Sequence, residues 1–133
     1  MSVEEKVCVK VLGSMINYAA RQIAKFDNDF KDKLKGLNEV IQWKIGDDIA
    51  YYTEIKDQDI KGVDGTAPSP TLTFEISDIG VALKLLTAQA DIGSLGDVVK
   101  VSDPEKAQQL AFILEKVGEY SEGMQGYILA KSV

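Results

Sequence analysis

The spacing of apolar residues changes twice along the chain, and this change limits the fold more than any other feature of the sequence. Near the N-terminus apolar residues recur every three or four positions, the spacing along one face of an α-helix. In the middle they alternate with polar residues, as in half-buried strands. The helical spacing returns near Ile79. Helices on both sides of a strand-rich centre, in 133 residues, predict a single domain of the α+β class.

The N-terminal segment from Val3 to Lys25 is predicted to form one long helix. Ser2, with Glu5 three residues later, has the sequence pattern of a capping box at its start. Cys8 lies in the apolar register of this helix, and we predict that it is a buried structural residue. Asp27 to Asp29 should then end this helix and cap a short second one. The apolar stripe of the first helix consists of Val3, Val7, Val11, Met15, Ala19 and Ile23.

Four strands are predicted in the centre of the chain from the alternation of apolar and polar residues. A tight turn at Gly46-Asp47-Asp48 joins the first two strands into a hairpin, and Asp57-Gln58 supplies a second turn. The segment from Asp64 to Pro70 contains two prolines and a glycine, so it should be a loop. The predicted strands span residues 41–45, 51–55, 60–63 and 71–76.

The C-terminal part of the chain is predicted to contain two further helices with a short strand, residues 98–101, between them. Ser77 is the expected N-cap of the first helix. Asp103 followed by Pro104 is a strong start signal for the second helix, and Gly118 is its expected stop. For residues 119–133 the sequence leaves both helix and strand open.

Composition argues against several classes of function. A net charge of −6 argues against nucleic-acid binding, which depends on clustered Lys and Arg. The chain has no histidine and a single cysteine, so histidine-based catalysis, His-ligated zinc and an intrachain disulfide are excluded. The longest apolar run, Leu110 to Leu114, is too short to span a membrane. The N-terminus lacks the features of a signal peptide, so we expect a soluble cytoplasmic protein.

No active site can be identified in the sequence. The paired acids Asp27 with Asp29, Asp47 with Asp48, and Asp57 with Asp59 lie where caps and turns are expected. The glycines at Gly93 and Gly96 precede a strand, whereas phosphate-binding loops lead into a helix. We therefore predict no catalytic residue, no metal site and no cofactor.

The order of the predicted elements resembles that of the sterol carrier protein type 2 family, over about Phe26 to Val117. Residues 36–45 (GLNEVIQWKI) are similar to the family's first strand. Residues 70–78 (PTLTFEISD) are similar to the strand whose end caps the next helix, and residues 99–105 (VKVSDPE) to the last strand and helix start. Ser102 stands where the family usually has a glycine before the Asp-Pro pair.

The resemblance implies a freestanding single domain, residues 1–133, with a helical extension at about residues 1–25, a core at about 26–117 and a tail at about 118–133. It also implies a mixed five-stranded sheet with helices packed on one face, enclosing an apolar tunnel that binds lipids without changing them. Thr53 is expected on the same face, and Lys84 and Lys100 are the headgroup candidates. The implied tunnel-lining residues are Ile41, Trp43, Ile45, Tyr51, Ile55, Leu72, Phe74, Ile76, Leu83, Leu86, Leu110 and Leu114.

Three functions from different classes follow as hypotheses. The first is a non-catalytic lipid carrier that holds a fatty acyl, sterol or isoprenoid-like tail, without nucleic acid or stable membrane insertion. The second is a protein-interaction or dimerisation domain with a solid core, in which the first helix and the apolar tail form the contact surface of a homodimer. The third is a hydrolase or isomerase acting on a lipid, which a raised carboxylate pKa inside the cavity would favour.

Overall fold

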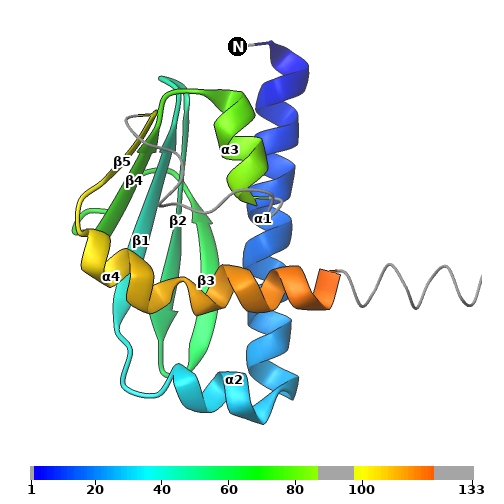
Figure 1. Ribbon diagram of the computed structural model, residues 1–133, viewed down its shortest axis with the longest axis vertical. Coiled ribbons are helices and arrows are strands. Elements are labelled where there is room, and N and C mark those ends of the chain that lie inside the picture. The colour runs from blue at the N-terminus through cyan, green and yellow to red at the C-terminus, as the bar shows by residue number, and fades with distance from the viewer. Residues whose placement is uncertain (1, 87–97, 122–133) are drawn as a thin grey trace, which may run out of the picture.

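Five strands form one mixed sheet in the order β3-β2-β1-β4-β5 (Figure 1). The structure is a computed structural model that describes residues 2–86 and 98–121, and their side chains except at 83–86. Strand β1 pairs antiparallel with β2 and parallel with β4, and the outer pairs are antiparallel. The predicted α+β class and mixed five-stranded sheet are confirmed. The strands are β1 (Glu39–Ile45), β2 (Ile49–Lys56), β3 (Asp59–Asp64), β4 (Leu72–Ile76) and β5 (Val99–Val101).

Short turns hold the first three strands in register. Asp57 and Gln58 both adopt positive φ angles, 53° and 59°, as the two central residues of a tight hairpin turn require. Gly46 begins the β1–β2 turn with a φ of 61°. Both turns lie where the sequence predicts them.

The named helices of the described residues mostly begin at the predicted caps. The Ser2 side chain accepts a hydrogen bond from the Glu5 N–H, and Glu5 completes the capping box. Asp27 and Asp103 cap the second and fourth helices. The third helix differs from prediction, because the Asp78 carboxylate, not Ser77, accepts from its first free N–H groups. The helices are α1 (Val3–Phe26), α2 (Asn28–Lys33), α3 (Ile79–Leu86) and α4 (Pro104–Leu110).

The helical chain does not stop where the sequence predicts. After a turn at Ala111, helical backbone resumes at residue 112 and passes through Gly118 to residue 121. Gly118 lies inside this helix and is not a stop. A glycine ends a helix where it adopts the left-handed conformation, and Gly118 is not among the glycines with a positive φ angle.

The helices cover one face of the sheet. The side chains of Trp43 in β1, Tyr51 in β2 and Phe74 in β4 lie side by side on that face and are buried. Residues at alternate positions, such as Lys44 and Glu75, lie on the other face and are exposed. This alternation is the pattern that the sequence predicts.

The opposite face of the sheet carries one buried polar side chain, Gln42, which is fully enclosed. Its Nε2 group donates to the carbonyl oxygens of Tyr51 at 3.0 Å and of Gly65 at 3.2 Å. Its Oε1 atom accepts from the Ala67 N–H at 2.7 Å. The loop between β3 and β4 therefore folds back over this face, and Gln42 attaches the loop to the sheet.

Only one face of α1 is buried, and the sequence-based assignment of that face is partly wrong. The helix lies against β3 and β2 (Figure 1) through a buried face that includes Val9 and Ile23. Cys8 is exposed, not buried. Apolar residues extend around more than half of α1, but a single sheet can cover only one side of a helix. The exposed apolar residues of α1 are Val3, Val7, Val11, Met15, Tyr18 and Phe26.

Among the described residues, no helix is both long enough and apolar enough to cross a membrane.

Candidate functional site

Part of the predicted tunnel lining surrounds one cavity between the sheet and the helices. The sheet contributes its floor, and the opposite wall comes from α1, α4 and the helical turns after α4. The predicted residues that meet there are Ile41, Trp43, Tyr51, Leu72, Phe74, Leu110 and Leu114.

The cavity is small, about 40 Å³. Pockets that enclose small-molecule ligands are usually roughly 300–1,000 Å³. Aromatic rings occupy much of the space: Trp43 stacks on Phe74 with ring centroids 4.6 Å apart, and on Tyr51 at 6.2 Å. In this structure the space between the layers is close to a packed core, and the tunnel stays a prediction.

Other predicted lining residues lie elsewhere. Ile45, Ile55 and Ile76 are fully buried on the helix-covered face, but they do not line this cavity. The side chains of Leu83, Lys84 and Leu86, in α3, lie outside the described residues. Lys100 of β5 is exposed. It lies opposite Glu75 in the register of β4 and β5, on the sheet face away from the helices, so it lies far from the cavity lining.

Several lining residues were missed by the sequence reasoning, chiefly small or polar residues of the helices. Gly13 and Asn17 of α1 and Ala107 of α4 line the cavity. Gly13 is needed because the Tyr51 ring lies against the helix at this point. One sequence signal could have identified these lining residues: a glycine and an asparagine lie one turn apart among the apolar residues of a helix.

A chain of hydrogen bonds crosses from the sheet to α1. The indole N–H of Trp43 donates to Thr53 Oγ1 at 3.3 Å, and the Thr53 hydroxyl donates to Asn17 Oδ1 at 2.7 Å. The Thr53 hydrogen needs an acceptor, so the Asn17 oxygen must face Thr53 and its Nδ2 group must face the other way. All three side chains are buried.

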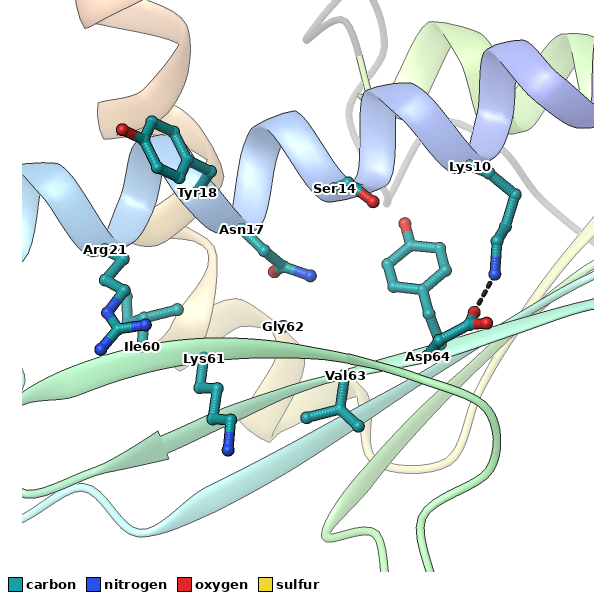
Figure 2. A pocket seen from close by; sticks show the side chains of 11 residues that line it. Lys10, Ser14, Asn17, Tyr18, Arg21, Ile60, Lys61, Gly62, Val63 and Asp64 are labelled. Carbon is teal, nitrogen blue, oxygen red and sulfur yellow. Dashed lines mark hydrogen bonds and ion pairs between the residues drawn. The ribbon is translucent and has the colours of Figure 1, made fainter.

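The Nδ2 group of Asn17 faces a groove of about 530 Å³ between α1 and β3 (Figure 2). Figure 2 shows Lys61 and Val63 of β3 pointing away from α1, so the polar wall of the groove is formed mainly by the helix. The groove is lined by Lys10, Ser14, Asn17, Tyr18, Arg21, Tyr51, Ile60, Lys61, Gly62, Val63 and Asp64.

Ion pairs connect the two walls of the groove. Lys10 pairs with Asp64 at one end, and Arg21 Nε lies 3.5 Å from Asp59 Oδ1 near the other. Both pairs join α1 to β3, the edge strand of the sheet. Exposed ion pairs contribute little stability, so their main effect is to position the two cationic side chains.

Two polar groups in the groove have no hydrogen-bond partner among the described residues. Within the described ranges, neither the Tyr51 hydroxyl nor Asn17 Nδ2 makes a hydrogen bond, although the two residues are only 7% and 8% exposed. Every fully buried side-chain nitrogen or oxygen in the same ranges has a partner, so these two atoms reach the groove surface. Burial raises the pKa of the Tyr51 hydroxyl far above its ordinary value. A tyrosine hydroxyl is protonated at neutral pH even at its ordinary pKa, so this group can donate.

Comparison with known proteins gives a likeness of fold only. The sequence matches no protein-family model and no curated protein. Among solved structures it is similar to the stereoselective inverting sec-alkylsulfatase Pisa1 from Pseudomonas sp., at 16% identity and a TM-score of 0.50. The match covers 64% of this chain and only 14% of that enzyme. The chain therefore shares the fold of one small part of a much larger protein.

Proposed function

We propose that this protein is a non-catalytic lipid-binding and lipid-carrying module, which holds an apolar tail between the sheet and the helices. One observation carries the proposal: the apolar cavity and the larger groove meet at Tyr51 and Asn17, which line both. A ligand with a polar head and an apolar tail would place its head in the groove and its tail in the cavity, with Tyr51 and Asn17 between the two spaces. The resemblance to the sterol carrier protein type 2 family points to the same class of ligand.

The cavity would have to widen to accept a tail, and we expect its helical wall to be the side that moves. Ile16, Ala111 and Leu114 on that wall are only partly buried, whereas Ile41 and Phe74 on the sheet are buried. Each buried methylene contributes roughly 0.8 kcal/mol, so a tail of about twelve carbons supplies about 10 kcal/mol before ordering costs. That free energy is large enough to offset a modest separation of the layers.

Native mass spectrometry of freshly purified protein, paired with the denatured mass, tests the proposal. A native excess of a few hundred daltons that is lost on denaturation is the expected result, and its mass identifies the lipid class. Titration with a fluorescent fatty acid should give saturable binding by the purified chain. Absence of both a co-purified lipid and saturable binding would overturn the proposal.

A cavity-filling variant separates a ligand site from a solid core. Ala111→Leu adds bulk at a partly exposed cavity wall, and we expect it to reduce fatty-acid binding with little loss of stability. Gln109→Leu, at an exposed position of α4, is the matched control and should bind normally. Equal binding by both variants would place the tail outside this cavity.

The exposed side of α1 favours a second function, dimerisation with another copy of this chain. Its apolar stripe, Val3, Val7, Val11, Met15 and Tyr18, is between 49% and 76% exposed. The helix has acids in its first turn and Lys25 in its last. Two antiparallel copies would place the acidic end of each helix beside the basic end of the other, with the apolar residues between them.

Sedimentation velocity over a range of protein concentrations tests this second function. We expect a concentration-dependent dimer that Val11→Lys abolishes. Gln109→Lys places the same charge on an exposed face of α4 and should leave the dimer intact. A monomer at every concentration would exclude dimerisation through α1.

A further inference from the structure

Strand β3 forms the longer of the two edges of the described sheet (Figure 1), with six residues against three in β5. The Gly65 N–H donates to the Ala50 carbonyl at 3.0 Å. Because hydrogen-bonded pairs alternate along an antiparallel ladder, the backbone groups of Gly62 and Asp64 point away from β2. Among the described residues, neither of these two N–H groups has a hydrogen-bond partner. Such an edge is a template for another strand.

The exposed apolar residues of α1 are arranged symmetrically along the helix. Val11 and Tyr18 lie equally far from a midpoint between residues 14 and 15. Val3 and Phe26 form a second such pair. In two antiparallel helices that meet at this midpoint, each of these residues lies opposite its counterpart in the other copy. The apolar stripe of α1 is therefore complementary to itself.

The charges at the two ends of α1 follow the same symmetry. Glu4 in the first turn and Lys25 in the last turn lie equally far from the midpoint, and both are exposed. Neither forms an ion pair within the described ranges. The same antiparallel arrangement therefore brings opposite charges together, which favours a second copy of this chain as the partner. The remaining counterparts are Val7 with Gln22 and Met15 with Ser14.

The midpoint of the stripe lies level with Gly62 of β3. Lys10 pairs with Asp64. Arg21 pairs with Asp59, so the helix runs antiparallel to the strand. From Lys10 to Arg21 the helix rises roughly 16 Å, close to the rise of β3 from Asp64 to Asp59. On this scale Gly62 lies opposite the midpoint, so one twofold axis suits both the edge of β3 and the stripe of α1.

The stripe and the edge also lie on the same side of the molecule. Tyr18 belongs to the stripe and lines the groove between α1 and β3. Val11 lies two turns before Tyr18 on the same side of the helix. A twofold axis normal to the sheet keeps both helices on one face. A strand that pairs with the edge of β3 therefore brings its own helix toward Val11 and Tyr18.

We propose that a second copy of this chain pairs its β3 with the edge of β3, antiparallel, about a twofold axis at Gly62. Each Gly62 then exchanges two backbone hydrogen bonds with the partner's Gly62. The Asp64 N–H donates to the carbonyl oxygen of the partner's Ile60. The two sheets become one continuous sheet, and Val11 of α1 packs on the partner's Tyr18. The inference rests on the proposed dimerisation through α1 and adds to it the edge strand and the register of the interface.

Amide hydrogen exchange, followed by NMR over a range of protein concentrations, tests the edge pairing. Exchange at Gly62 and Asp64 should slow by about tenfold or more in the dimer, because their N–H groups gain carbonyl partners. The amides of Lys61 and Val63 point toward β2, so they are internal controls and should change much less. Contact through the helices alone would leave exchange at Gly62 and Asp64 unchanged.

Asp64→Pro removes one outward N–H, a change that an edge strand tolerates. We expect the dissociation constant of the dimer to rise roughly tenfold or more, because two symmetry-related hydrogen bonds are lost. Asp64→Ala also removes the ion pair with Lys10 but keeps the N–H. It is therefore the matched control and should dimerise normally. The melting temperature of each variant, measured where it is monomeric, checks that the fold is intact.

Disulfide trapping tests the register of the two helices. In a Cys8→Ser background, Val11→Cys combined with Tyr18→Cys should give a covalent dimer on oxidation. Within one chain these two positions lie roughly 10 Å apart, too far for a disulfide. Val7→Cys combined with Tyr18→Cys is the matched control, because this pair is four residues out of register and should give little covalent dimer.

The outcomes separate the edge pairing from dimerisation through α1. A monomer at every concentration would contradict both. A dimer in which Gly62 and Asp64 exchange as fast as in the monomer would overturn the edge pairing, while dimerisation through α1 would stand. Equal trapping by the Val11–Tyr18 and Val7–Tyr18 pairs of variants would overturn the twofold axis at Gly62.

Discussion

Tyr51 of β2 lies directly against Gly13 of α1. A Cβ at Gly13 would come within 2.5 Å of the ring carbon Cζ of Tyr51, closer than any real Cβ contact. This contact sets the distance between the helix and the sheet at the point where the cavity and the groove meet. The glycine is therefore required for packing, in a helix where glycine is otherwise unfavourable.

Gly13→Ala should destabilise the protein, although the same change at an open helix position gains about 1 kcal/mol. We expect the clash with the Tyr51 ring to lower the free energy of unfolding by about 1–3 kcal/mol. This change in the free energy of unfolding can be measured by urea unfolding, followed by the fluorescence of Trp43, the single tryptophan. Ser14→Ala, at the next and exposed position, is the control. A stabilised Gly13→Ala variant would show that the helix and sheet are not in close contact here.

Gln42→Leu should cost about 2 kcal/mol or more, because it leaves buried backbone groups of the β3–β4 loop without partners. The Ala67 N–H loses its acceptor, and the Gly65 carbonyl loses its donor. Hydrogen exchange of the Ala67 amide should accelerate, and the midpoint of urea unfolding should shift to a lower urea concentration. Unchanged exchange at Ala67 would mean that Gln42 does not hold the loop.

Tyr120→Phe should raise the pKa of Asp27. The Tyr120 hydroxyl donates to Asp27 Oδ2 at 2.7 Å, and this hydrogen bond is the main cause that lowers the pKa of Asp27 below its ordinary value near 3.8. The stabilisation by ionised Asp27 is present above its ordinary pKa and is lost as pH falls through the lowered pKa. The variant should therefore lose less stability on acidification than the wild type.

NMR titration of the Asp27 carboxyl carbon measures this shift directly. Tyr18→Phe, at an exposed tyrosine of α1, is the control and should leave the titration unchanged. An Asp27 titration that is identical in Tyr120→Phe and wild type would place Tyr120 away from the start of α2.

Cys8 should react with a thiol reagent in the folded protein about as fast as in denaturant, because it is exposed on α1. The rate of reaction of Cys8 with Ellman's reagent, in the folded protein and in denaturant, measures this. Protection that increases with protein concentration would indicate that a second copy covers this side of α1. Protection at every concentration would contradict its exposed position.

The sequence by itself determined the local structure. The capping box at Ser2, the caps at Asp27 and Asp103, and the turn at Asp57-Gln58 lie where predicted. These features depend on residues within a few positions of one another, so their chemistry can be read directly from the chain. Strand alternation is equally local, and it correctly assigned Trp43, Tyr51 and Phe74 to the buried face.

Tertiary structure alone decided which of these residues meet. Parallel pairing of β1 with β4 brings Trp43 beside Phe74, and the return of the β3–β4 loop buries Gln42 on a face that its strand pattern predicts to be polar. The exposure of Cys8 and the groove at Tyr51 and Asn17 depend on which side of α1 meets the sheet. A helix that is apolar over most of its surface can pack on several sides. The choice depends on shape, here on Gly13 and Gly62, and periodicity carries no information about shape.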